Sequence, residues 1–426
     1  MDFEISNNKI FYINNTPIKP IFYEELKNLK KIIFDKKFNL PINWNLIPDN
    51  IEKITFLSNY SHNIKLPTNL KKLNIQNLTK INFELPKNLK KLYMTFTPSI
   101  DENILKNINL NKLHIIFSKF EEMPNIFLPQ SIKVLIIKNH YIGVFNPSSY
   151  NPIFPINFNI LPQRLKVLKI INSNSPLNIL PNTLQYLSIN CCYFDQDISI
   201  LKNTNIKKFV LFSNHFNKPL DNLPNSLKSL KLMLTIFNYP IDNLPMNLKT
   251  LKIFDFMSFT HNLDNLPLIK ILSLNCENLI KNNSLDFLPI TLKSLEINSS
   301  TNINLTNLPK NLKIFKLTSF SDVVFDLKNL PNSIEVLFLH FRNFQNYNNL
   351  ILPINLQLLA LECRENYYNI VFCNQHTSSN FNVILHEKVQ LVLMNEYCNI
   401  DEYRRNYPNV KIITNSGYYK ILGKYF

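Results

Sequence analysis

The sequence predicts a solenoid of short stacked coils with one β-strand per coil. Two observations carry this prediction: a short segment recurs along the chain, and its apolar residues alternate as in a strand. The clearest copy is Leu223–Leu232, and its skeleton returns at Leu244-Pro245, Leu288-Pro289, Leu308-Pro309 and Leu330-Pro331. The copies are mostly 19 to 22 residues apart, a period that is typical of solenoids.

Each repeat can be numbered from its proline, which is position zero. Positions three, six and eight are large and apolar in sixteen repeats, as in Leu227, Leu230 and Leu232. The alternation at positions six to eight predicts a strand, and a proline just ahead of a strand costs little. About four inward side chains per coil, at roughly 1.5–3 kcal/mol each, make stacked coils stable where one coil is not.

So short a period leaves little room for a helix on the return side of a coil. We therefore expect a parallel sheet on one side and turns, extended segments and short 3₁₀ pieces on the other. Residues 1–25 lack the repeat and are interpreted as an N-terminal cap. Residues 26–363 form the array of about sixteen coils, and residues 364–426 are interpreted as degenerate coils with a C-terminal cap.

Composition argues against catalysis and against cofactors. The chain has only three glycines, so the glycine-rich loops that cradle phosphates are excluded. Its six cysteines show no C-x-x-C spacing, and reduced thiols are expected. The eight histidines are scattered without metal-ligand spacing; His114, at an outward position seven, is expected to be solvated. We predict a protein that is not an enzyme and has no cofactor or metal.

The first residues, from Met1 to Glu4, are acidic and do not resemble a signal peptide. No apolar run approaches the ~20 residues that a membrane helix needs. We expect an intracellular, cytoplasmic protein that does not bind membranes.

The formal net charge is +16, which favours acidic partners such as nucleic acid or another anionic surface. A second explanation is codon bias. The chain is rich in Lys, Asn, Ile, Phe and Tyr and has five arginines among 46 basic residues, as AT-rich codons would produce.

Lysines recur at position four, just after the first apolar residue of the strand segment. They are expected to line the concave side of the sheet, about 5 Å apart in neighbouring coils. They either bind an anionic partner or solubilise the sheet and cover apolar neighbours with their stems. The candidate binding residues are Lys71, Lys90, Lys133, Lys166, Lys207, Lys228, Lys249, Lys270, Lys293 and Lys313.

One interval is long, because 33 residues separate Pro129 from Pro162. The insertion falls near residues 139–157, and insertions in solenoids become loops that often bind partners. The alternative is a surface loop whose aromatic residues pack on its own coil. Its candidate contacts are Tyr141, Phe145, Tyr150 and Phe154.

The repeat resembles the FNIP repeat family, which is leucine-rich-repeat-like. The resemblance is carried by Phe216–Leu220 before Leu223-Pro224 and by Phe237–Ile241 before Leu244-Pro245, and it covers about residues 26–363. FNIP proteins occur chiefly in social amoebae and in giant DNA viruses of amoebae; a viral member would act in its host cell. The resemblance implies a leucine-rich-repeat-like right-handed solenoid with its parallel sheet on the concave face, and protein–protein interaction.

The leading hypothesis is a non-enzymatic scaffold for protein–protein interaction, whose partner and oligomeric state remain open. The first alternative is binding of nucleic acid or another polyanion through the concave lysines. The second is a substrate-recognition subunit linked to a ubiquitin ligase. It follows from the resemblance alone, because some FNIP proteins carry an F-box, and no F-box is seen here.

Overall fold

The computed structural model describes most of the repeat array and isolated parts of the two ends. The described residues are 5–6, 10–13, 23–24, 26–75, 83–97, 100–101, 103–117, 126–139, 161–174, 176–177, 179–254, 259, 261, 263–275, 285–319, 321, 325–341, 351–363, 391–394, 405 and 411–413. The chain divides into two compact units, Met1–Ser213 and Asn214–Phe426, and each is described by itself.

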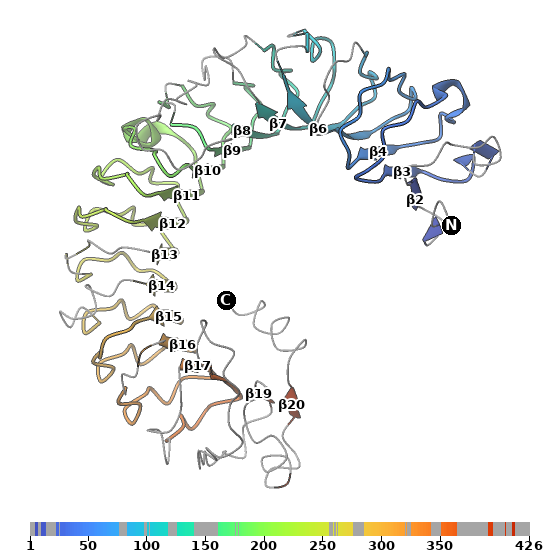
Figure 1. Ribbon diagram of the computed structural model, residues 1–426. Helices are drawn as coiled ribbons and strands as arrows, with labels where there is room; N and C mark the ends of the chain where they lie inside the picture. The colour runs from blue at the N-terminus through green and yellow to red at the C-terminus, as the bar shows by residue number, and fades with distance from the viewer. Residues whose placement is uncertain are drawn as a thin grey trace. The chain divides into compact units, whose positions relative to one another are not determined.

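In the first unit, successive strands lie side by side (Figure 1). β1 and β2 form an antiparallel pair, β2 pairs in parallel with β3, and each later strand through β11 pairs in parallel with the one before it. The strands are β1 Ile5–Ser6, β2 Ile10–Ile13, β3 Lys31–Phe34, β4 Lys53–Phe56, β5 Lys72–Ile75, β6 Lys91–Phe96, β7 Lys112–Phe117, β8 Val134–Asn139, β9 Val167–Ile171, β10 Tyr186–Asn190 and β11 Lys208–Ser213.

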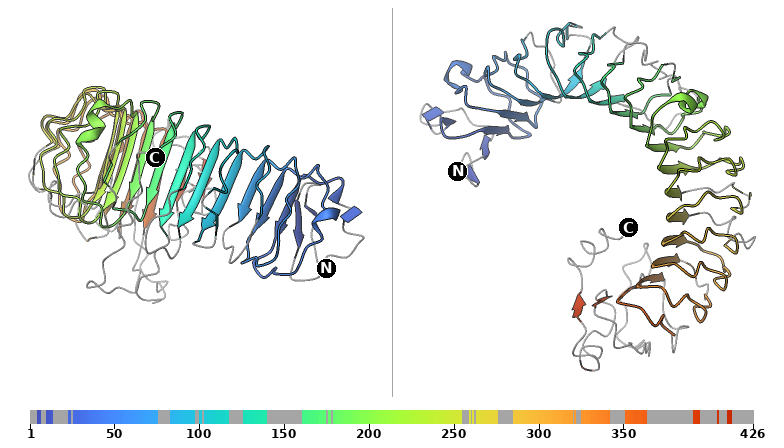
Figure 2. Two further views of the ribbon diagram at one scale, coloured as in Figure 1. Left: turned by 90° about the horizontal axis from the view of Figure 1, so that it is seen from above. Right: turned by 180° about the vertical axis from the view of Figure 1, so that it is seen from behind.

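The second unit repeats this arrangement, and all its described strand pairs are parallel (Figure 2). The strands are β12 Ser229–Leu234, β13 Thr250–Phe254, β14 Ile271–Asn275, β15 Ser294–Asn298, β16 Ile314–Ser319, β17 Val336–Phe341, β18 Leu358–Cys363, β19 Leu391–Met394 and β20 Lys411–Ile413.

The register places the same repeat position of neighbouring coils side by side. In β12 and β13, for example, Leu230 pairs with Leu251 and Leu232 pairs with Ile253. These side chains and Leu227 at position three have no exposed surface. The prediction that positions three, six and eight form the core is therefore confirmed.

The return side of the coils consists of turns and extended chain, with the 3₁₀ helices η1 Trp44–Leu46 and η4 Ser199–Asn203. Phenylalanines stack between coils there: the ring centroids of Phe216 and Phe237 are 6.4 Å apart, and those of Phe237 and Phe259 are 6.1 Å apart. The fold is a leucine-rich-repeat-like solenoid with a parallel sheet and little α-helix among the described residues, as predicted.

The proline of each repeat begins a tight turn ahead of the strand. The carbonyl of Pro224 accepts the N–H of Leu227 at 3.0 Å, and Pro245 and Leu248 are joined in the same way at 2.9 Å. Positions one and two therefore lie at the tip of a turn. After the turn, position four precedes the strand, which begins at position five in the coils from β3 to β18.

Candidate functional site

The side of the sheet that points away from the core is the main candidate surface. We call it the strand face; it consists of the side chains at positions five, seven and nine. Along β12, buried residues alternate with half-buried ones. The inward positions are Leu or Ile in most coils, with Phe or Met in the others, whereas the strand face is more varied and carries Lys, Thr, Ser, Tyr, His, Val, Ile and Phe.

The position-four lysines lie at the start of the strands rather than on them. The carbonyl of Lys71 accepts two N–H groups of the next coil, from Lys90 at 2.9 Å and Lys91 at 3.0 Å. Two consecutive residues thus face one, as in a β-bulge. This local break in alternation turns both positions four and five toward solvent, which strict strand periodicity did not predict.

All ten predicted lysines lie within the described residues, at the same edge of their sheets. Lys90 and Lys313 are half-buried, and the remaining members are exposed. The predicted loop near residues 139–157, with Tyr141, Phe145, Tyr150 and Phe154, lies outside the described residues apart from Asn139. Its role in binding stays a prediction.

A second row of lysines occupies position five and is more regular. It pairs in exact register across five strands, β3 to β7, and we call it the lysine column. Its members are Lys31, Lys53, Lys72, Lys91 and Lys112. Strand spacing in a sheet brings such neighbours within about 5 Å, so like charges repel along the column.

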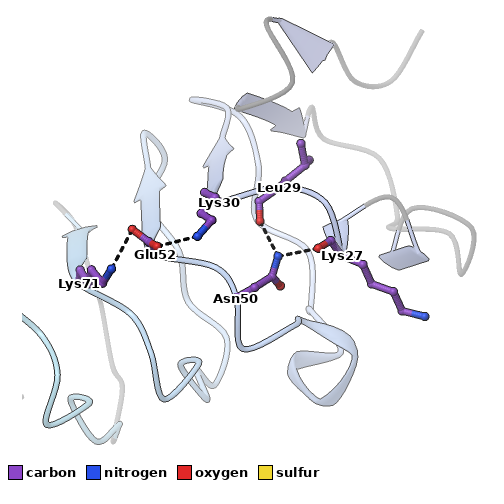
Figure 3. A network of polar contacts seen from close by, with 6 residues as sticks. All are labelled: Lys27, Leu29, Lys30, Asn50, Glu52 and Lys71. Atoms are coloured by element: carbon purple, nitrogen blue, oxygen red, sulfur yellow. Dashed lines mark hydrogen bonds and ion pairs between the residues drawn. The ribbon is translucent and has the colours of Figure 1, made fainter.

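The charge of the lysine column is poorly balanced by acidic residues. Glu52 forms ion pairs with Lys30 at 2.9 Å and Lys71 at 3.1 Å, both at position four (Figure 3). Hydrogen bonds from these two ammonium groups lower the pKa of the Glu52 carboxyl. No member of the lysine column forms an ion pair with any residue the structure describes.

Lys53, in the middle of the column, shows the consequence of this imbalance. Its pKa is lowered by burial first and then by the charges of Lys31 and Lys72. A counter-charge supplied from outside would relieve this repulsion. Positive charge is therefore concentrated along the lysine column.

The strand face of the second unit differs, because lysines there contact acidic or aromatic side chains of the same unit. Lys316 forms an ion pair with Glu296 at 2.7 Å, and the hydroxyl of Ser273 donates to the same carboxylate at 2.6 Å. Burial acts to raise the pKa of Glu296, but Lys316 and the other donors outweigh it and the pKa is lowered. The ammonium of Lys231 lies 5.1 Å from the ring centroid of Phe254.

At β17 and β18, the strand face is mostly apolar and its side chains are buried. Val336, Phe338 and His340 of β17 and Leu358 and Ala360 of β18 are all buried. These residues are therefore not part of an open binding surface. The open, charged part of the strand face that the structure describes lies mainly in the first unit.

His114 contradicts the expectation of a solvated histidine. It lies on the strand face at position seven of β7, but it is only 8% exposed and its ring contacts Tyr93, with centroids 3.7 Å apart. Burial lowers the pKa of the imidazole to about 4, and the charges of Lys112, Lys138 and Lys169 act in the same direction. The expectation was wrong because it considered one strand, whereas long side chains of neighbouring strands cover position seven.

Sequence reasoning also missed the role of the polar residues at position two. The side-chain amide of Asn50 donates to the carbonyls of Lys27 at 2.6 Å and Leu29 at 2.8 Å (Figure 3). The hydroxyl of Ser333 donates to Leu312 at 2.6 Å, one coil earlier. The recurrence of Asn, Thr or Ser at this position was the available signal, and it marks contacts between coils.

Within the part of the chain that the structure describes, no three His, Cys, Asp or Glu residues are placed to hold a metal ion. Cys191 and Cys192 are free thiols, and burial raises the pKa of the Cys191 thiol. Among the described residues no helix has the length and apolar character to cross a membrane.

Together, these coils define a leucine-rich-repeat-like solenoid whose strand face is basic in the first unit. No protein-family model and no curated protein matches the chain, so membership of the FNIP family stays a prediction. Solved structures do resemble it. CroV588, described as a novel circular LRR protein, is 20% identical with a TM-score of 0.47, over 93% of this chain and 70% of the other.

Two further structures are similar at lower identity. TLR13 in a complex with ssRNA13 is 16% identical with a TM-score of 0.47, and the match covers 95% of this chain and 64% of that one. The Toll–Spatzle complex of Drosophila is 13% identical with a TM-score of 0.46, over 92% of this chain and 64% of that one. These similarities concern the fold alone.

Proposed function

We propose that the protein is a non-enzymatic scaffold that binds an acidic partner protein on the strand face of its first unit. The observation that carries this proposal is the lysine column, which is in register over five strands and lacks a described ion-pair partner. Inward positions are constrained by packing, so the variable outward positions are free to select a partner. An acidic protein surface supplies the missing counter-charges.

The test is affinity capture of the tagged protein from its native cell, with and without nuclease, followed by mass spectrometry. We expect a discrete acidic protein that survives nuclease and is lost with the Lys72→Glu/Lys91→Glu variant. A Lys36→Glu/Lys37→Glu variant is the matched control, because both lysines are exposed in the same unit outside the column. Equal capture by both variants would contradict the proposal. Recovery of ubiquitin-ligase subunits would support the adaptor role that the FNIP resemblance implies.

Binding of nucleic acid is the second candidate, favoured by the same unbalanced charge. It predicts that affinity for a fluorescent single-stranded oligonucleotide falls steeply with salt, because bound cations are released. Each phosphate neutralised contributes about −0.7 to the slope of log K against log salt for a single strand. A shallow slope, or equal binding by the two double variants, excludes this candidate.

A further inference from the structure

Four consecutive coils of the second unit share a pattern that the other coils lack. Each has Asp at position minus three and Lys at the position-four site, on either side of the proline turn. The segments are Asp221–Lys228, Asp242–Lys249, Asp264–Lys270 and Asp286–Lys293. In the first unit position minus three is never acidic, as Asn45 and Ile64 illustrate. Folding of a coil therefore does not require this pattern.

Between the two charged rows, three coils place an apolar residue at position one. Met246 is 73% exposed, Leu268 54% and Ile290 67%. In every coil of the first unit that carries the proline, the corresponding position is polar: Asp49, Thr68, Lys87, Gln130, Gln163 and Asn182. Large apolar side chains at three successive turn tips form a contiguous exposed stripe, and such stripes mark interaction sites.

The backbone aligns these residues in rows. The N–H of Lys249 donates to the carbonyl of Lys228 at 2.9 Å, and that of Lys270 donates to Lys249 at 2.8 Å. The turn of the Pro267 coil is one residue shorter: the N–H of Ile269 donates to the carbonyl of Pro267 at 2.6 Å. Lys270 therefore keeps its place in the row.

The acidic row is aligned by side chains. The carboxylate of Asp221 accepts the amide of Asn243 at 3.3 Å, and that of Asp286 accepts the amide of Asn307 at 3.1 Å. Because positions one and two form the tip of each turn, the apolar row lies along the most protruding line of this surface. The acidic row lies on one side of the apolar row and the basic row on the other; we call these two rows the flanks, and the whole surface the turn edge.

The turn edge is complementary to itself. A two-fold axis parallel to the rows places Met246, Leu268 and Ile290 against their own copies. The same rotation exchanges the flanks, so the Asp row of one copy faces the Lys row of the other on both sides. A surface of this kind forms an isologous interface, and charge complementarity selects this orientation over the one in which like rows meet.

We propose that the turn edge, from Asp221 to Lys293, binds a second copy of this chain in a two-fold symmetric dimer. The surface of four coils is smaller than the ~800 Å² that each partner buries in a standard interface. The dimer is accordingly weak, with a dissociation constant in the micromolar range. This surface is separate from the strand face, so the dimer and the proposed partner can be tested independently.

The test is sedimentation velocity of the full chain over a range of concentrations, with two charge-reversal variants. Lys249→Asp/Lys270→Asp makes both flanks acidic in the two central coils, and Asp242→Lys/Asp264→Lys makes both flanks basic there. Each variant alone should remain monomeric, because like charges then face each other on both flanks. An equimolar mixture should form a heterodimer, since every acidic row again faces a basic one.

Lys90→Asp/Lys166→Asp is the matched control, since it changes the same repeat position in the first unit; it should dimerise like the wild type. Met246→Asn/Leu268→Asn should weaken the dimer at least tenfold while the circular dichroism spectrum stays unchanged. The proposal is overturned if the wild type is monomeric up to about 100 µM, a range that includes micromolar affinities. It is also overturned if the charge variants dimerise unaided or if their mixture stays monomeric.

Discussion

Single polar residues decide how well adjacent coils join. Ser213 is fully buried, and its hydroxyl lies 2.7 Å from the carbonyl of Phe194 and 3.2 Å from that of Cys192 in the preceding coil. Each hydrogen bond of this kind contributes about 0.5–1.5 kcal/mol to stability. Small polar residues such as this one stabilise the corners of the solenoid.

Replacement of Ser213 by alanine tests this role. We expect a loss of about 1–3 kcal/mol in the free energy of unfolding, because the variant removes two hydrogen bonds made by a fully buried hydroxyl. Urea denaturation followed by circular dichroism measures it. Ser188→Ala, on the strand face of β10, is the control and should change the stability by no more than about 0.5 kcal/mol. Equal effects of the two variants would contradict the role.

His114 makes the stability of the protein depend on pH. Its folded-state pKa, about 4, is below its ordinary value of 6.5. The unfolded chain therefore binds a proton that the folded chain excludes between these two pH values. His114 contributes no penalty above pH 6.5, and stability is lost as the pH falls from 6.5 toward 4.

The variant His114→Gln should show a shallower pH dependence over this window. The expected difference in slope is up to about 1.4 kcal/mol per pH unit, the value for one proton. Urea denaturation at several pH values between 4 and 7 measures it. Identical slopes for wild type and variant would mean that His114 is protonated in the folded protein.

At the scale of elements, strands are held mainly by the inward residues at positions six and eight. Leu230 of β12 is completely buried and lies beside Leu251 of β13. We expect Leu230→Ala to cost about 2–5 kcal/mol, the range for a core leucine that leaves a cavity. Ile179→Ala, at an exposed position, is the control and should cost about 0.5 kcal/mol or less. A core variant as stable as the control would contradict this assignment.

At the scale of the whole molecule, each coil contacts its neighbours, so damage should remain local. Stability in such proteins is a sum of repeat terms and nearest-neighbour terms. Leu295→Ala removes a buried side chain from β15. We expect faster amide hydrogen exchange in β14 to β16 and unchanged exchange in β3 to β8. Uniform acceleration along the chain would show that it opens as one cooperative unit.

The sequence by itself determined the fold class, the strand positions and the core, because the inward positions of a stacked coil must be apolar and recur with the coil. Leu227, Leu230 and Leu232 illustrate this requirement. It also identified the lysines, since their recurrence at one position was visible in the chain.

Only the tertiary structure decided how the side chains of different coils combine. The burial of His114, the register of the lysine column and the contacts of Asn50 and Ser213 all depend on residues about twenty positions away. Repeat periodicity describes one coil at a time, and these properties arise between coils. The strand face and the turn edge became recognisable as surfaces for the same reason: both consist of rows that run across coils.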